Sequence, residues 1–300
     1  MDMLTVSHVS KSFGENRVVD DLSFSVAEHT IFGFIGQNGA GKTTTMNMIL
    51  GLLKAESGEI RVNGEAVRFG RTPTNAYIGY LPDVPEFYGF MTPGEYLDLC
   101  GKVTGMTRAQ RERKSAELLD LVGLGGAHKR IQGFSRGMKQ RLGIAQALLS
   151  DPLLLICDEP TSALDPLGRK EILDLLLHVK DRTTVVFSTH ILSDVERICD
   201  EAAFLHRGRL ALGGKLQELK SIRQSGGLEL EFYSAAEAER FKALFPASGS
   251  LTALKLTLKQ QTQEETRNVL RMLAARNIPV RRIERLEPEL EDLFMEMVRE

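Results

Sequence analysis

The chain has 300 residues, of which 42% are hydrophobic and 26% charged, so it holds enough apolar material for about two packed domains. Its net charge of −2 gives no sign of a nucleic-acid partner, and none is expected. No apolar run approaches the ~18 residues that span a bilayer, the first residues lack the pattern of a secretory signal, and the three widely spaced cysteines are typical of reduced thiols in a cytosol.

The first elements in chain order are predicted strands. Met3–Ser7 and Asp21–Val26 alternate between apolar and polar residues, and Ile31–Ile35 is a short apolar run that ends in glycine. A helical pattern follows from Lys42 to about Leu53. Asn63-Gly64, between two short strand-like segments, predicts a hairpin with a two-residue turn.

The middle of the chain alternates between helical and strand patterns. The pattern is helical from Thr92 to Val122, where Thr92-Pro93 is typical of a cap followed by a first-turn proline, and again over Arg136–Leu149. Leu153–Cys157 and Thr184–Ser188 are apolar, partly β-branched segments, each followed by a helical stretch. Strands that alternate with helices predict a parallel α/β sheet.

The composition changes near Ser221–Gly227, which we predict to be a linker. Beyond it, strands and helices are expected in alternation, over Leu228–Tyr233, Ala235–Leu244, Leu251–Leu258, Gln263–Ala275, Val280–Leu286 and Glu289–Val298. Elements of this length predict a small α+β domain of about 75 residues.

A glycine-rich motif joins the third predicted strand to the first predicted helix. It matches G-x-x-x-x-G-K-[ST], with the residues Gly36, Gln37, Asn38, Gly39, Ala40, Gly41, Lys42 and Thr43. Its glycines allow backbone N–H groups to surround a phosphate, and the helix adds the positive end of its dipole. Lys42 is expected on the β- and γ-phosphates and the Thr43 hydroxyl on Mg²⁺. A chance glycine-rich turn is the alternative, but the placement between a strand and a helix favours phosphate binding.

Two adjacent carboxylates, Asp158 and Glu159, follow the apolar strand Leu153–Cys157. Adjacent residues on a strand point to opposite sides, so the chain must turn at the strand end for both to face the phosphates. Asp158 is then expected to hold Mg²⁺ through water, and Glu159 to polarise the attacking water. The alternative is a plain pair of surface carboxylates.

Three further segments, Phe134–Arg141, Ser162–Asp165 and Ser188–His190, occur in a fixed order around this strand. They resemble the signature, D-loop and H-loop of the ABC ATPase family, and the resemblance extends from about Met3 to Lys215. It implies a P-loop NTPase fold, with a RecA-like parallel sheet core, an antiparallel β subdomain and an α-helical signature subdomain, followed by the small α+β domain. We therefore expect an ATPase domain over residues 1–220, with its helical subdomain at about 84–150, and an accessory domain over 226–300.

The resemblance also implies a site for ATP and Mg²⁺. The expected nucleotide-binding residues are Phe13, Gly36, Gln37, Asn38, Gly39, Ala40, Gly41, Lys42, Thr43, Thr44, Ser135 and Gly137; the expected catalytic residues are Lys42, Glu159 and His190, and the expected Mg²⁺ ligands are Thr43, Asp158 and Asp83. Phe13 would stack on adenine, where the family more often has Tyr, although a core position in a strand is the alternative. His190 would contact the γ-phosphate and orient the water, although a lone histidine is often structural. Ser135 and Gly137 would complete the ATP site of a second protomer.

Two segments depart from the family pattern. The consensus Leu-Ser-Gly-Gly-Gln becomes Phe134–Met138, in which Arg136 either meets a phosphate or is solvated. Asp83 stands where the family usually has Gln; it can accept from a metal-bound water but adds negative charge near Mg²⁺. Together, these features are similar to the ATPases that serve ABC-2-type exporters, including bacitracin and other drug exporters.

The partners are also implied by the resemblance. One phosphate loop and one signature mean that each chain needs a second copy or a paralogue, together with a separate transmembrane permease. Phe87, Tyr88, Phe90 and Met91 are either a docking patch for that permease or a local core. We expect a cytoplasmic ATPase subunit, peripheral on the inner face of the cell membrane, that powers export of a small molecule, drug, peptide antibiotic or lipid-like substrate. The alternative is a non-transport ABC ATPase that acts in a soluble assembly.

Overall fold

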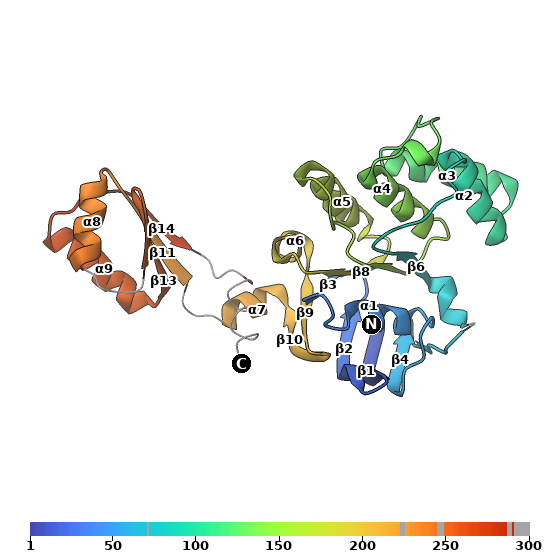
Figure 1. Ribbon diagram of the computed structural model, residues 1–300, viewed down its shortest axis with the longest axis horizontal. Coiled ribbons are helices and arrows are strands. Elements are labelled where there is room, and N and C mark those ends of the chain that lie inside the picture. Colours follow the sequence, from blue (N-terminus) through green and yellow to red (C-terminus); the bar gives the residue numbers. More distant parts are fainter. Residues whose placement is uncertain (71, 223–225, 245–248, 287–289, 291–300) are drawn as a thin grey trace. The chain divides into compact units, whose positions relative to one another are not determined.

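The computed structural model describes residues 1–70, 72–222, 226–244, 249–286 and 290. The chain divides into two compact units, Met1–Leu216 and Gln217–Glu300 (Figure 1). The assignment of these units as an ATPase domain and an accessory domain stays a prediction. Among the described residues, no helix combines the length and the apolar character that crossing a bilayer requires.

The first unit begins with an antiparallel sheet of order β2-β1-β4-β5. Its strands are β1 (Asp2–Phe13), β2 (Asn16–Ala27), β4 (Ser57–Val62) and β5 (Glu65–Ala66). The turn between β4 and β5 consists of Asn63 and Gly64, whose φ angles of 49° and 76° both lie in the left-handed region. This geometry is typical of two-residue hairpin turns and confirms the predicted hairpin.

A second, mostly parallel sheet has the order β10-β9-β3-β8-β7-β6. Its strands are β3 (Ile31–Gly36), β6 (Ile78–Leu81), β7 (Leu154–Cys157), β8 (Thr184–Thr189), β9 (Glu201–His206) and β10 (Arg209–Lys215). Only β10 runs antiparallel to its neighbour. All residues of β3, β7 and β8 are buried, as expected for the centre of a parallel sheet. The predicted parallel α/β architecture is confirmed, and the carboxyl ends of β3, β7 and β8 meet at one edge, where ligands bind in such sheets.

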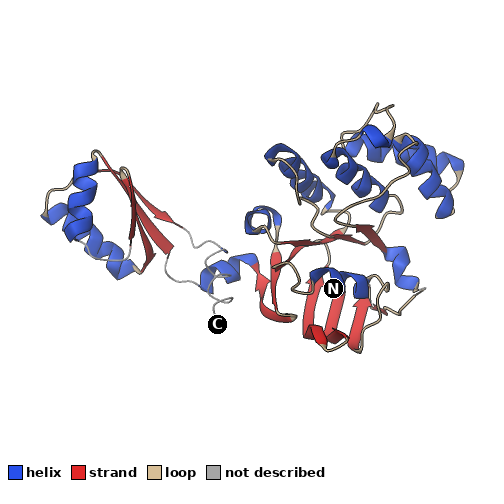
Figure 2. Ribbon diagram, in the orientation of Figure 1, coloured by secondary structure: helices blue, strands red, loops and turns tan. Residues whose placement is uncertain are grey.

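The helices of the first unit are α1 (Lys42–Ile49), α2 (Pro93–Val103), α3 (Arg108–Leu121), α4 (Arg136–Ala147), α5 (Pro166–Val179) and α6 (Leu192–Ile198), with short 3-10 helices at Pro73–Tyr77 and Ile131–Gly133 (Figure 2). The helical pattern predicted over Thr92–Val122 divides into α2 and α3. Thr92 caps α2, as predicted, and Thr107 caps α3, each through a capping box with the residue three positions later. A second cap inside one helical pattern explains why it forms two helices.

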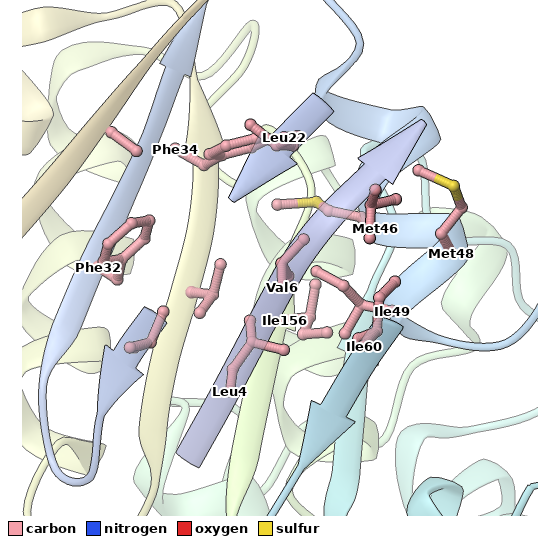
Figure 3. Close-up of a cluster of buried hydrophobic side chains, with 14 of the residues drawn as sticks. Leu4, Val6, Leu22, Phe32, Phe34, Met46, Met48, Ile49, Ile60 and Ile156 are labelled. Carbon is pink, nitrogen blue, oxygen red and sulfur yellow. The ribbon is translucent and has the colours of Figure 1, made fainter. Parts of the chain in front are cut away.

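A shared core joins the two sheets of the first unit (Figure 3). It takes side chains from both sheets and from α1, among them Leu4, Val6, Phe32, Phe34, Met46, Met48, Ile49, Ile60 and Ile156. Phe24 of β2 stacks on Phe32 and Phe34 of β3, with ring centroids 5.4 Å apart in both pairs. Because β3 and α1 both contribute to this core, the loop between them is anchored at both ends.

In its described residues, the second unit contains a four-stranded antiparallel sheet and the helices α8 and α9. After α7 (Leu216–Ile222), its elements are β11 (Gly226–Phe232), α8 (Ala235–Leu244), β12 (Gly249–Thr252), β13 (Lys255–Gln261), α9 (Gln263–Ala275) and β14 (Val280–Leu286). The βαββαβ sequence and the order β12-β13-β11-β14 correspond to a ferredoxin-like arrangement. The unit has its own core, in which the rings of Phe232 and Phe241 lie 5.8 Å apart.

Three predictions for this end of the chain have different outcomes. The predicted linker Ser221–Gly227 is wrong at both ends, because α7 continues to Ile222 and β11 begins at Gly226. The single strand predicted over Leu251–Leu258 is also wrong, because the chain reverses after Thr252 and forms the β12–β13 hairpin. The helix predicted over Glu289–Val298 lies, apart from Leu290, outside the described residues.

Candidate functional site

The glycine-rich loop lies between the carboxyl end of β3 and the first turn of α1. Gly41 has a φ of 105°, and a Cβ added to it would lie 2.7 Å from the carbonyl oxygen of Val18. A Cβ on Gly36 would lie 2.8 Å from the carbonyl oxygen of Leu205. Glycine is therefore required at both positions, and the backbone of the loop can follow a close curve with its N–H groups available to an anion.

Lys42 is buried within this loop, with 6% of its surface exposed. Its Nζ donates to the carbonyl oxygen of Gly36 at 2.7 Å and to that of Gln37 at 3.3 Å. Nζ also lies 3.1 Å from Oε1 of Glu159, although this carboxylate oxygen accepts no hydrogen bond from any residue that the structure describes. The ammonium group is thus held among loop carbonyls, where it can reach phosphate oxygens bound by the loop.

Thr43 and Asp158 bring two oxygen ligands together. The Thr43 hydroxyl donates to Oδ2 of Asp158 at 2.8 Å, and the Ser188 hydroxyl donates to Oδ1 of the same carboxylate at 2.5 Å. Asp158 itself is buried. A hydroxyl and a carboxylate are ligands that Mg²⁺ accepts, and Mg²⁺ normally completes its shell with water and substrate phosphates, so this pair fits the metal.

Glu159 turns the chain at the end of β7. Its φ of 47° lies in the left-handed region, so the turn that the sequence required between the two carboxylates is present. Its backbone N–H donates to Ser188 Oγ at 2.9 Å, and its Oε2 lies 2.9 Å from Nδ1 of His190. Asp158 and Glu159 therefore face the same site, and His190 is close enough to orient the Glu159 carboxylate.

Several of the predicted residues line one cleft of about 340 Å³ at this edge of the sheet. Its lining residues are Val18, Gln37, Asn38, Gly39, Gly41, Lys42, Thr43, Thr44, Asp83, Asp158 and Glu159. Val18 and Ser188 had no predicted role. Ser188 lies near the end of β8, the strand beside β7, two residues before His190.

Six predicted residues lie outside the lining of this cleft, namely Phe13, Gly36, Ala40, Ser135, Gly137 and His190. Phe13 ends β1 with 53% of its surface exposed and Nζ of Lys11 5.4 Å from its ring centre, so the alternative of a strand core residue is wrong. Ser135 caps α4 by accepting from the N–H of Met138 at 3.2 Å, and Gly137 follows in its first turn. Adenine stacking by Phe13 and phosphate contact by Ser135 and Gly137 stay predictions.

Asp83 lies at the boundary between this cleft and the helical subdomain. Its backbone carbonyl accepts from Nε2 of Gln140 at 2.8 Å, and its Oδ1 lies 3.2 Å from Nη2 of Arg136. Burial raises the pKa of the Asp83 carboxyl, Arg136 opposes that shift, and Asp158 and Glu159 add to it. Arg136 is therefore paired within its own chain, an arrangement that the sequence did not predict.

A neighbouring cleft of about 460 Å³ runs from Asp83 along the segment that follows it. It is lined by Asp83, Val84, Pro85, Glu86, Phe87, Gly89, Ile131, Gln132, Arg136 and Lys139. Phe87 packs edge-on against Tyr96 at 5.0 Å and is half-buried, whereas Tyr88 and Phe90 are 55% and 62% exposed. Phe87 thus belongs to a local core, whereas a docking role for the exposed rings of Tyr88 and Phe90 stays a prediction.

Comparison with known proteins agrees with this geometry. The family model described as ABC transporter matches residues 19–162. An uncharacterized ABC transporter ATP-binding protein, YxlF of Bacillus subtilis (strain 168), is 38% identical over 99% of both chains. The bacitracin transport ATP-binding protein BcrA of Bacillus licheniformis is 42% identical over 69% of this chain and 68% of its own. A solved ATP-binding subunit of an ABC transporter superimposes with a TM-score of 0.65 at 34% identity, over 73% of this chain and 92% of that one.

Proposed function

The chain belongs to the ATP-binding proteins of the ABC transporter family, and from that membership we propose that it hydrolyses ATP to drive a separate membrane permease. One observation carries the proposal. A buried lysine, a hydroxyl paired with a carboxylate, and a second carboxylate beside a histidine converge on one cleft at the carboxyl edge of the parallel sheet. This set contains the groups that phosphoryl transfer to water requires.

Each side chain has a distinct part in the proposed reaction. Lys42 and the N–H groups of the loop stabilise negative charge on the β- and γ-phosphates. Thr43 and Asp158 would hold Mg²⁺, which when bound neutralises charge on the same oxygens. Glu159 orients the attacking water and accepts its proton, while His190 holds the Glu159 carboxylate through the 2.9 Å contact and faces the γ-phosphate.

The working form is proposed to be a dimer. Ser135 and Gly137 lie at the start of α4 and do not line the cleft of their own chain, as residues for a second protomer's nucleotide must. A head-to-tail pair, of two copies or of this chain and a paralogue, would bury the same surfaces from both sides. ATP binding closes this dimer in the proposal, and hydrolysis opens it.

The membrane subunit is proposed to dock at the cleft beside Asp83. The exposed rings of Tyr88 and Phe90 form an apolar surface on the helical subdomain, on either side of Gly89, which lines this cleft. This arrangement would place the chain on the inner face of the cell membrane. Export is the proposed direction, with a small molecule, drug, peptide antibiotic or lipid-like substrate, and it rests on the likeness to BcrA, whose name refers to bacitracin transport.

The ATPase proposal is tested with Glu159→Gln, which keeps the shape of the side chain but removes the proton acceptor. We expect ATP hydrolysis to fall by about 100-fold or more, since general-base catalysis contributes at least that much. We also expect an ATP-bound dimer to persist in size-exclusion chromatography with light scattering. Lys42→Ala is the control and should form no such dimer, because it removes the phosphate contact. Unchanged turnover in Glu159→Gln would exclude the assigned role of Glu159.

The alternative to the transport proposal is an ATPase that acts in a soluble assembly. Purification of the chain from detergent-solubilised cells distinguishes the two. The chain should co-purify with a membrane subunit, and Tyr88→Ser with Phe90→Ser should weaken that association without loss of ATPase activity. Recovery with soluble proteins alone would favour the alternative.

A further inference from the structure

Asp83 and Arg136 are two of the positions at which the chain departs from its family's pattern, and their side chains are in contact. They are 53 residues apart in sequence, yet Oδ1 of Asp83 lies 3.2 Å from Nη2 of Arg136. Asp83 lines the nucleotide cleft as well as the neighbouring cleft, whereas Arg136 lines only the second. The pair therefore joins the site where phosphates bind to the first turn of the signature helix α4.

The backbones on both sides of this pair are firmly held. The carbonyl of Asp83 accepts from the buried Gln140 of α4 at 2.8 Å. Strand β6, which leads into Asp83, packs directly on α4, since a Cβ on Gly79 would lie 2.2 Å from the carbonyl oxygen of Ala147. The side chains of Asp83 and Arg136 are nevertheless 47% and 41% exposed. They can change partners without movement of the strand or the helix.

The charges around Asp83 explain why a cation is needed beside it. Asp83 is the third carboxylate at the cleft, beside Asp158 and Glu159, and an uncompensated negative charge there would repel the phosphates of ATP. Arg136 compensates it. An exposed ion pair contributes at most about fivefold to an equilibrium, which corresponds to about 1 kcal/mol. Such a pair is weak enough for a divalent cation to displace.

We propose that Arg136 is a positioning residue that holds Asp83 away from the metal position until Mg²⁺·ATP enters the cleft, when Asp83 turns to the metal and Arg136 is released. The guanidinium group of Arg136, in the first turn of α4, is then released from Asp83 only when Mg²⁺·ATP occupies the cleft of the same chain. The inference rests on the proposed function, because it requires that this cleft binds ATP with Mg²⁺. It makes Asp83 a link between nucleotide binding in one protomer and the surface that faces the next.

The test compares nucleotide affinity with and without metal in four proteins: wild type, Arg136→Gln, Asp83→Asn and the double variant. A fluorescent ATP analogue is titrated into each in Mg²⁺ and in EDTA, at a chain concentration where sedimentation shows a monomer, so that contacts from a second protomer do not contribute. The quantity measured is the ratio of the dissociation constant in EDTA to that in Mg²⁺.

Arg136→Gln should raise this ratio by up to about fivefold, because Mg²⁺ no longer competes with a cation while the unpaired Asp83 repels metal-free ATP. The same change in the Asp83→Asn background should leave the ratio unchanged, and Arg136→Lys should restore the wild-type value. Lys129→Gln is the matched control, since Lys129 lies against Phe134 in the same subdomain and lines neither cleft.

Two other results separate the inference from the proposed function. If Arg136→Gln does not change the ratio of dissociation constants, or changes it equally in the wild-type and Asp83→Asn backgrounds, the proposed positioning of Asp83 by Arg136 is wrong. ATP binding by the cleft is unaffected by that result. A wild-type chain that binds no ATP in either buffer overturns the proposed function and the positioning of Asp83 together.

Discussion

Among single residues, Ser188 connects the two adjacent carboxylates of the site. Its hydroxyl donates to Asp158 and accepts from the backbone N–H of Glu159, so one small side chain fixes the proposed metal ligand and the proposed base relative to each other. The adjacent carboxylates could be predicted because they follow an apolar strand. The role of Ser188 could not, because it depends on the pairing of β8 with β7.

Ser188→Ala should therefore impair both the fold and the chemistry. It leaves Asp158 Oδ1 and the Glu159 N–H without a partner, and each buried group left unpaired costs about 1–3 kcal/mol. We expect a lower free energy of unfolding in urea and a lower ATPase rate. Ser57→Ala, at an exposed serine, should change stability by no more than about 0.5 kcal/mol. Equal losses in the two variants would contradict the bridging role.

Cys157 is fully buried in β7, and burial raises its pKa, as it does that of Cys199. The contact between Asp83 and Arg136 could not be predicted from the sequence. Both residues are visible as departures from a pattern, but their proximity follows from the packing of β6 on α4 and has no signal in the sequence.

At the level of elements, β6 and α4 are in close contact. Besides Gly79 against Ala147, a Cβ on Gly143 would lie 2.5 Å from Cδ1 of Leu81. Strand β6 was not predicted, since its four residues contain a glycine and become a strand only by pairing with β7. The β9–β10 hairpin was missed for a related reason. Its turn at Arg207-Gly208 has φ angles of 47° and 79°, but Arg is not a residue that signals such a turn.

Gly79→Ala should force β6 and α4 apart. Overpacking of this kind costs about 1–3 kcal/mol, and we expect the loss in the urea midpoint together with weaker ATP-driven dimerisation, because α4 carries the signature residues. Gly94→Ala is the control. No heavy atom lies within 4 Å of a Cβ at Gly94, which sits in α2, so alanine there should be neutral or stabilising by up to about 1 kcal/mol. A similar loss in both variants would mean that the close contact is unimportant.

At the level of the whole molecule, the two units have separate cores. The strand and helix pattern after residue 226 predicted α8, α9 and β14 with correct bounds, because each has a clear periodicity. The β12–β13 turn was missed since Ala253 adopts a φ of 50° without glycine or asparagine. The ferredoxin-like topology depends on that hairpin and could not be predicted without it.

Because the two units have separate cores, we expect them to unfold in separate transitions. Phe241→Ala, at a fully buried ring of the second unit, should destabilise that unit by about 3–5 kcal/mol. Circular dichroism in urea should then show an earlier transition, while the affinity for a fluorescent ATP analogue stays within about twofold of wild type. Tyr233→Ala, at a ring that is 65% exposed, is the control and should leave both unchanged. A large loss of ATP affinity in Phe241→Ala would show that the second unit supports the nucleotide cleft.

The contact between Gly41 and the carbonyl of Val18 limits how this nucleotide site can be reused in protein engineering. The loop is usually regarded as a strand, a turn and a helix, which here would be residues 31–49. In this chain its curve is also shaped by the backbone of β2, and Val18 forms part of the cleft. A transplanted segment that omits residues 16–27 would lose one wall of the site. A portable ATP-binding fragment of this protein therefore has to include β2.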